Sequence, residues 1–266
     1  MSDALDGPRL TELALGAGVC GVLTEAAGGT SPAPWAAPDG PGLDLGLGTG
    51  DDPGRVRANR ALLAGALGVG VAFATQVHGA RVLEVADRAA ATRDSVGEAD
   101  GLVTTVPEVA LAVLVADCVP VVLADPRARV VGVAHAGRRG VELDVVGAVL
   151  GAMLERGASP ADVRAVVGPS ACGRCYEVPA AMRDDVASRV PHVASTTSWG
   201  TPALDLPAAV EARLRALGVR DVVRDGRCTI EDGALFSHRR ATAPGGPGAT
   251  GRFAGVVALV DVDADA

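Results

Sequence analysis

The sequence predicts an α/β (α+β) protein built as a layered mixed-sheet α/β sandwich. Strand-like and helix-like runs follow one another irregularly along the 266 residues, without the strict alternation of a parallel βαβ fold. Hydrophobic residues make up 48% of the chain and aromatic residues only 2%, so the core must consist mainly of Val, Leu and Ala. Because no internal repeat is visible and the length suffices for a large core, we expect one domain over residues 1–266.

The first half of the chain contains one clear helix start and several strands. A stretch rich in Gly, Pro and Ala at 28–42 predicts a loop. Asp52 and Pro53 are typical of a helix N-terminus, so a helix is expected over 55–67, ending near Gly68. Short apolar, β-branched runs predict strands at 71–75, 81–85, 101–105, 109–115, 119–124 and 130–134, with a turn between the last two.

The second half alternates helices and strands. A strand is expected at 163–167, and the Gly- and Pro-rich segment 241–249 predicts a loop. Helices are expected at 141–156, 178–189 and 207–217, and late strands at 219–224 and 255–262.

Composition excludes several classes of function. The net charge of −8 and the shortage of aromatic residues argue against a nucleic-acid partner. The chain has no lysine, since all 24 cationic residues are arginine, which excludes a Schiff-base lysine and a P-loop lysine. Any phosphate site must therefore use arginine, backbone N–H groups or helix N-termini.

The sequence also favours a cytoplasmic location without a membrane partner. The apolar run at 109–116 is closed by Asp117 and is far shorter than a membrane-spanning helix. The first residues lack the basic region of a signal peptide, and the five cysteines are expected to be reduced thiols. We expect a monomer or a small homo-oligomer.

Three side chains able to bind a metal follow apolar strand-like runs. They are His78, Cys118 and His135, separated by 40 (118 − 78) and 17 (135 − 118) residues, which matches no compact zinc-finger pattern. A thiolate and two imidazoles at strand ends would leave one metal position open, as in catalytic zinc sites. The alternative is a buried free cysteine with two histidines satisfied elsewhere.

Neighbouring residues favour a shared site. Gly79 follows His78, and Gly137 lies two residues after His135, so the backbone can approach closely at both places. Asp117, beside Cys118, offers a carboxylate that could orient a ligand or act as a base.

The remaining cysteines give weaker signals. Cys172 and Cys175 form a C-x-x-C pair with no second such pair, so a packing or redox role is expected in place of a four-cysteine zinc site. Cys20 lies in an apolar strand-like run and is expected in the core, and Cys228 could lie near the site. His238 belongs to a basic cluster that could bind an anion.

Several motifs then follow one another along nearly the whole chain. They lie at 43–52, 76–79, 99–101, 116–120, 135–137, 168–169, 175–178, 237–240 and 250–252. In these motifs the chain resembles the multicopper polyphenol oxidase (laccase) domain family, also called YfiH-like. Members of that family are now regarded as purine nucleoside phosphorylases with adenosine deaminase activity.

The resemblance implies a site and a reaction. The metal-binding catalytic residues carry over to His78, Cys118 and His135, with zinc as the expected cofactor and copper less expected. The fold implied is a layered α/β sandwich related to bacterial toxin domains that use a Cys–His pair. The partners implied are phosphate and purine nucleosides (inosine, adenosine, guanosine and methylthioadenosine), which are cleaved to the free base and ribose 1-phosphate.

Both activities need further side chains. Without lysine, the phosphate must be held by arginines, and the candidates are Arg60, Arg239, Arg240 and Arg252. Deamination of adenosine needs a carboxylate that moves a proton, for which the candidates are Asp100, Asp117 and Glu177.

The chain departs from the family at three places: Arg138 stands where the family usually has Trp, Arg174 stands where it usually has Cys, and a longer Gly/Pro insert follows the basic motif.

Three other functions remain open. Cys118 could be the nucleophile of a metal-free hydrolase with His135 as its base. Copper-dependent phenol oxidation needs more imidazoles than four histidines provide, and a binding module without activity is the third alternative.

Overall fold

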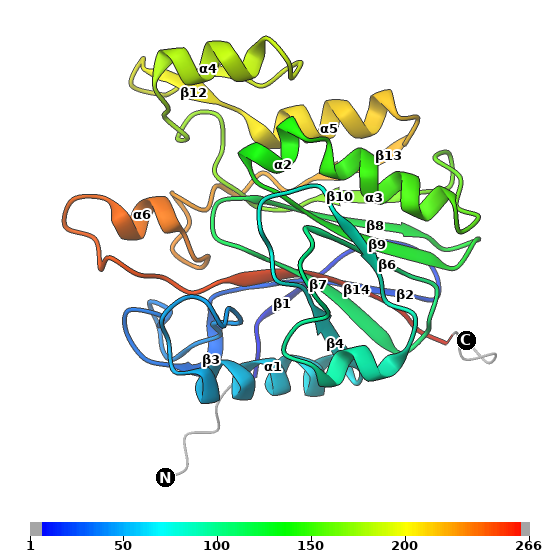
Figure 1. The fold of residues 1–266 in the computed structure, drawn as a ribbon. Coiled ribbons are helices and arrows are strands. Elements are labelled where there is room, and N and C mark those ends of the chain that lie inside the picture. Colours follow the sequence, from blue (N-terminus) through cyan, green and yellow to red (C-terminus); the bar gives the residue numbers. More distant parts are fainter. Residues whose placement is uncertain (1–6, 262–266) are drawn as a thin grey trace.

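Two large mixed sheets stack on each other in this computed structural model, which describes residues 7–261 (Figure 1). The first sheet runs in spatial order through β1 (Leu10–Glu12), β2 (Val19–Thr24), β14 (Phe253–Leu259), β7 (Val109–Val115) and β4 (Gly70–Phe73). The second runs through β13 (Asp221–Arg224), β10 (Arg164–Val167), β8 (Val119–Asp125), β9 (Val130–Ala136), β6 (Gly101–Thr104) and β5 (Val82–Glu84). The expected layered mixed-sheet α/β sandwich is confirmed.

Aliphatic side chains fill the layer between the two sheets. Leu111 and Val113 of β7 pack there with Val122 of β8 and Val133 of β9, all buried. Successive side chains point to opposite faces of a strand, so Ala112 of β7 lies on the other face, in the cluster beneath the first helix. Burial on both faces explains why these strands are continuous apolar runs.

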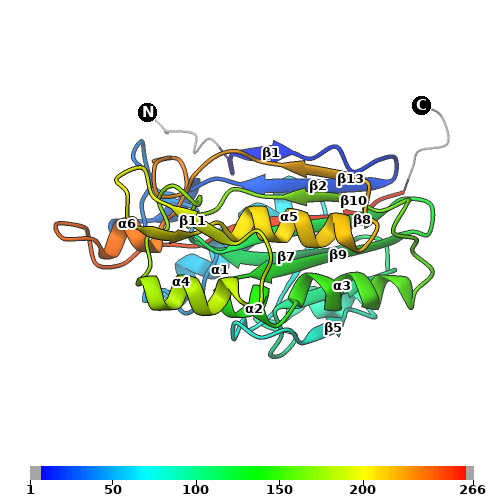
Figure 2. The same ribbon diagram turned by 90° about the horizontal axis from the view of Figure 1, so that it is seen from above.

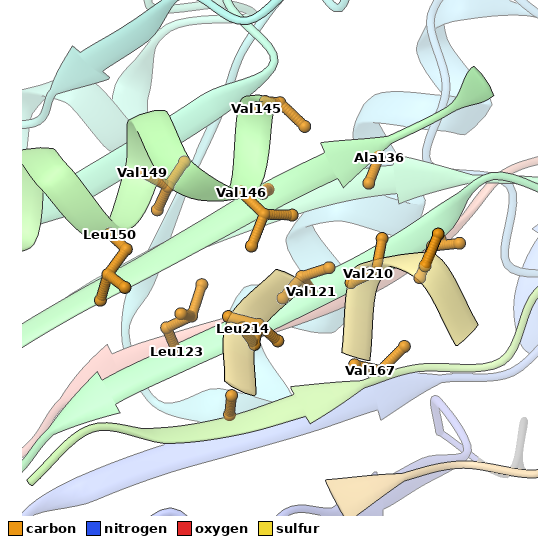
Figure 3. Packing of buried hydrophobic residues seen from close by; sticks show 14 of the residues in the cluster. Val121, Leu123, Ala136, Val145, Val146, Val149, Leu150, Val167, Val210 and Leu214 are labelled. Atoms are coloured by element: carbon orange, nitrogen blue, oxygen red, sulfur yellow. The ribbon is translucent and has the colours of Figure 1, made fainter. Parts of the chain in front are cut away.

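Helices cover the outer faces of the sandwich. α1 (Pro53–Leu67) lies against the first sheet, where Leu63 joins the cluster that contains Phe73 of β4. α3 (Val145–Leu154) and α5 (Leu206–Ala216) cover the second sheet side by side (Figures 1 and 2). In this cluster, Val149 of α3 and Leu214 of α5 meet the strand residues Val121 and Leu123 (Figure 3).

The first helix begins and ends as predicted. The Asp52 side chain accepts a hydrogen bond from the N–H of Arg55, Pro53 is the first helical residue, and Gly68 ends the helix with φ 69°. That left-handed conformation is one that glycine adopts without strain.

The expected helix at 141–156 is wrong in its extent, because the chain forms two helices there. α2 (Arg138–Glu142) is capped at its C-terminus by Leu143, and Asp144 then takes a left-handed φ of 59°. The Asp144 side chain accepts from the N–H of Gly147 and so caps α3. This local hydrogen bond competes with a continuous helix.

Other boundaries also differ. The expected loop at 28–42 contains most of β3 (Ala27–Ser31), whereas the expected loop at 241–249 overlaps the short helix α6 (His238–Thr242) only at its start. The predicted helix at 178–189 is shorter, as α4 (Ala180–Ala187), and the last residue of the predicted strand 255–262 lies outside the described residues. The remaining elements are η1 (Arg88–Thr92), β11 (Ala194–Thr196) and β12 (Pro202–Leu204). No helix within residues 7–261 has the length and apolar character needed to cross a membrane.

Candidate active site

The structure brings the three expected metal ligands together. One ligand atom from each of His78, Cys118 and His135 lies within 4.8 Å of the others, and we call these residues the trio. Cys118 Sγ is 3.9 Å from His78 Nε2, and the two imidazole rings meet edge to face with centroids 4.8 Å apart. Residues 40 and 17 positions apart in the sequence therefore form one cluster of donors.

Each member of the trio comes from a different part of the sandwich. His78 lies in the loop after β4, in a left-handed conformation with φ 59°. Cys118 lies in the connection between β7 and β8, directly after Asp117, which has φ 91°. His135 is the penultimate residue of β9 and has the strand parity of Val133, so its ring points toward the layer between the sheets.

Asp100 fixes two of these three residues. Its buried carboxylate accepts hydrogen bonds from the backbone N–H groups of His78 at 2.9 Å and Gly79 at 2.7 Å, and from Nδ1 of His135 at 2.8 Å. Burial acts to raise the pKa of Asp100, but the hydrogen bond from His135 and those from the backbone hold it below its usual value. Because Nδ1 of His135 is engaged, Nε2 is the ring atom left for a ligand.

The side chains of the trio shift one another's pKa values. Burial acts to raise the pKa of the Cys118 thiol, but hydrogen bonds with His135 and His78 lower it to about 6. Burial acts to lower the pKa of His135, yet Asp100 and Cys118 raise it to about 9. At neutral pH the metal-free trio therefore contains a thiolate beside an imidazolium.

Gly137 is required for the close packing of the trio. A Cβ atom at this position would lie 2.9 Å from Cys118 Sγ and 2.9 Å from His78 Cδ2. Any other residue would push the sulfur and the ring apart. This bears out the close backbone approach expected from the glycine after His135.

The trio opens into a cavity of about 800 Å³, a size suited to a small-molecule ligand. The cavity wall carries basic groups from four parts of the chain together with the single tyrosine, and these are Arg60, Arg138, Arg239, Arg252 and Tyr176.

Three of the four expected phosphate-binding arginines line this cavity. Arg60 donates from Nε to the Leu45 carbonyl at 2.9 Å and stacks over Phe73 at 3.9 Å, and burial lowers its pKa to about 10, so it stays charged at neutral pH. Arg239 lies over the Tyr176 ring, 5.1 Å from its centroid, and Arg252 contacts main-chain oxygens through Nη1.

Arg240 is not brought to the cavity. Its guanidinium donates to the main-chain carbonyls of Thr229, Asp232 and Leu235, so it holds a loop together. The sequence could not distinguish it from Arg239, because the two are adjacent in one basic motif.

The candidate carboxylates have separate environments. Asp117 lines the cavity, where it accepts from the Thr229 hydroxyl at 2.6 Å and from the N–H of Arg239 at 2.6 Å. Glu177 accepts from the indole N–H of Trp199 at 2.8 Å and is not among the cavity residues. Asp100, a candidate proton carrier in the sequence, instead contacts the trio directly.

The sequence assigned no role to two of the residues that line the cavity, Tyr176 and Gln76. The Gln76 amide donates from Nε2 to the Leu114 carbonyl and accepts at Oε1 from the Leu114 N–H, both at 2.7 Å. Both belong to motifs read from the sequence, and the chain's only tyrosine was the signal that could have singled out Tyr176.

Comparison with known proteins gives concordant matches. Residues 20–260 match the family described as multi-copper polyphenol oxidoreductase laccase. A protein of Streptomyces coelicolor named purine nucleoside phosphorylase is 48% identical over 240 residues, covering 89% of this chain and 94% of the relative. One of the same name from Mycobacterium bovis is 47% identical over 239 residues, covering 89% and 90%. The crystal structure of the Bacillus licheniformis hypothetical protein YfiH superposes with a TM-score of 0.82 at 30% identity, covering 96% of this chain and 98% of that one.

Proposed function

The chain belongs to the multi-copper polyphenol oxidoreductase laccase family, and we propose that it is a purine nucleoside phosphorylase. One observation carries the proposal: a single cavity of about 800 Å³ is lined both by the trio and by arginines able to hold phosphate. The relatives at 47–48% identity that are named purine nucleoside phosphorylase supply the substrate class. The proposed substrates are inosine, adenosine, guanosine and methylthioadenosine.

Phosphorolysis joins a phosphate oxygen to C1′ of the ribose and breaks the bond from C1′ to the purine nitrogen. The bonding electrons leave with the base, which must then gain a proton or be stabilised as an anion. We propose Arg60, Arg239 and Arg252 as the phosphate-binding residues, since they line the cavity and the chain has no lysine. Arg240 is omitted because it does not line the cavity.

We propose that the trio holds a zinc ion. Two imidazole nitrogens and a thiolate suit zinc, the cavity leaves a further position accessible, and Gly137 leaves room for the sulfur and the ring. When bound, the ion supplies a Lewis acid in the cavity. Asp100 positions His135 through Nδ1 and holds the backbone of His78.

A second activity, deamination of adenosine, uses the same cavity in our proposal. It replaces the 6-amino group by an oxygen from water and needs a carboxylate that takes and returns a proton. We assign that role to Asp117, because it lines the cavity next to Cys118, whereas Asp100 is committed to His135 and the backbone.

The test is an assay of purified protein with inosine, with and without phosphate. We expect hypoxanthine and ribose 1-phosphate in equal amounts, and no base release when phosphate is omitted. For a Cys118→Ala variant assayed in parallel, Cys20→Ala is the matched control, because Cys20 lies in β2 outside the cavity. Base release that does not depend on phosphate would contradict the proposal.

The low pKa of the Cys118 thiol beside two histidines also supports a second candidate, a metal-free cysteine hydrolase. Dialysis against a chelator separates the two functions. A zinc enzyme loses its activity and regains it with zinc, whereas a cysteine hydrolase keeps its activity throughout.

A further inference from the structure

A second cluster of possible metal ligands lies outside the trio. Cys172, Cys175, Cys228 and Glu231 each offer one donor atom, and these four atoms lie within 4.8 Å of one another. Cys175 and Cys228 are buried, Cys172 is partly buried and Glu231 is exposed. We call these residues the thiol cluster; it is enclosed by protein around its sulfurs and reaches solvent at its carboxylate.

Two turns of the same kind carry the four donors. Cys172 and Cys175 are three positions apart, and so are Cys228 and Glu231. The N–H groups of Cys175 and of the next residue both donate to the Cys172 carbonyl at 2.9 Å. The N–H groups of Glu231 and of the next residue donate to the Cys228 carbonyl at 3.0 and 2.8 Å. A tight turn that brings together two ligands separated by two residues is the arrangement found in structural zinc sites.

The two turns are joined at their first cysteines. Ser170 and Cys228 form a parallel β-bridge, in which the N–H of Thr229 donates to the Ser170 carbonyl at 3.1 Å. The N–H of Cys172 donates to Cys228 Sγ at 3.4 Å. A backbone N–H directed at sulfur favours the thiolate, which is the form that binds metal.

Charge around the cluster is consistent with bound metal. Three thiolates and a carboxylate around a divalent ion would leave excess negative charge, and Arg174, between the two cysteines of the C-x-x-C turn, places a cation in the same turn. Metal binding would release the protons of the cluster's thiols.

We propose that Cys172, Cys175, Cys228 and Glu231 form a second metal site that holds a structural zinc ion. Four donors with three sulfurs in a largely enclosed cluster match the ligand number and softness that zinc prefers. The C-x-x-C pair lacks a second C-x-x-C in the sequence, and the structure supplies a C-x-x-E turn in its place. The site does not depend on the reaction proposed above.

The thiol cluster also connects to the cavity wall. Tyr176, which follows Cys175, lines the cavity, and Thr229, which follows Cys228, donates its hydroxyl to Asp117 at 2.6 Å. A zinc ion joining the two turns would therefore hold two segments of this wall in a fixed relation.

Metal content in the absence of the trio tests the proposal. The double variant His78→Ala/Cys118→Ser removes two trio ligands, and we expect it to retain about one zinc per chain after gel filtration. Adding Cys228→Ser should remove that zinc, whereas adding Cys20→Ser, the matched control in β2, should not. Cobalt substitution of the double variant should give a strong thiolate-to-cobalt charge-transfer band. A double variant without zinc, or zinc that persists after Cys228→Ser, overturns the site.

A measurement on the unaltered chain covers the case in which Cys228→Ser does not fold. The protein is alkylated before and after chelation, and peptides containing Cys172 and Cys118 are quantified separately by mass spectrometry. We expect alkylation of Cys172, which is partly buried, to rise at least about tenfold once metal is removed. An unchanged rate, or a disulfide between two of the cluster's cysteines in freshly purified protein, overturns the proposal.

Discussion

The trio and the thiol cluster combine sulfur with other donors, but they are assembled in different ways. The trio takes one residue from each of three distant segments, and a cavity of about 800 Å³ opens onto it. The thiol cluster takes two residues from each of two tight turns, and its sulfurs are mostly covered. The open arrangement leaves room for a substrate, whereas the enclosed one can mainly hold segments together.

The side chains around the sulfur atoms also differ between the trio and the thiol cluster. Cys118 faces two imidazoles, which lower its pKa to about 6 although burial acts to raise it. Burial raises the pKa of Cys175 and Cys228, and no histidine belongs to their cluster. One chain thus contains a thiol with a lowered pKa, Cys118, and two buried thiols with raised pKa values, Cys175 and Cys228.

The largest expected effect is a loss of catalytic activity when the trio, and not the thiol cluster, is altered. Cys118→Ala should lower the rate of inosine phosphorolysis by about 10³-fold or more, because it removes the sulfur from the proposed metal site. The melting temperature should stay close to that of the unaltered protein. Retention of the original rate by a folded, pure variant would show that the trio is not the catalytic centre.

The converse change should act on stability. Cys228→Ser should lower the free energy of unfolding by about 3–4 kcal/mol in zinc-containing buffer, as expected for loss of an ion present at several hundred times its dissociation constant. Denaturant titration with and without chelator measures this difference. If the chelator destabilises the variant as much as the unaltered chain, the thiol cluster does not account for metal-linked stability.

In the metal-free chain at pH 7, Cys118 should be alkylated about 100-fold or more faster than Cys175. A thiol reacts as its thiolate, so alkylation of Cys118 should rise with pH around a midpoint near 6, and Cys175, with its raised pKa, should react only at strongly alkaline pH. Peptide mapping after timed alkylation gives both profiles. Coincident midpoints would mean that the histidines do not ionise Cys118.

Asp100→Asn should reduce activity by about 10–100-fold, the usual effect of removing a carboxylate that orients a metal-binding histidine. Asp100 helps raise the pKa of His135 to about 9 in the metal-free chain, and a metal-binding imidazole must be unprotonated, so the acid side of the variant's zinc-binding and activity profiles should move to lower pH. Asp184→Asn, at an exposed ion pair with Arg183, is the control and should change neither quantity. An unshifted pH profile would assign Asp100 a purely structural role.

The smallest effect concerns the cavity wall. Arg138 lines the cavity and forms an ion pair with Glu142 at 2.5 Å, at the position where the sequence resemblance leads us to expect Trp. Arg138→Trp should tighten nucleoside binding by about 0.5–1.5 kcal/mol through stacking on the purine. The measured quantity is the KM for inosine, and a higher KM would show that Arg138 itself contacts the substrate.

Elements with strong local signals could be predicted from the sequence. The strand at 109–115 has the observed bounds of β7, because a continuous apolar run lies between Glu108 and Asp117. α1 is marked by Asp52, Pro53 and Gly68. The break at Asp144 could not be predicted, since it depends on a left-handed residue within an apolar run. β11 and β12 have three residues each and form through their pairing with each other.

The candidate site could also be predicted only in part, because some of its residues have roles that depend on contacts between distant parts of the chain. His78, Cys118 and His135 follow apolar strands, so their residue types and positions carried a signal. The roles of Asp100 and Arg240 depend on which atoms they meet in three dimensions. The thiol cluster was missed because Glu231 replaces the second cysteine of the expected pattern.

The position of β14 has a consequence for biosynthesis. This late strand pairs with β2 on one side and β7 on the other, so the first sheet has a gap until residues 253–259 have left the ribosome. Until then, β2 and β7 expose unpaired apolar edges of the kind that associate between chains. A nascent chain stalled upstream of β14 is therefore a natural client for a chaperone.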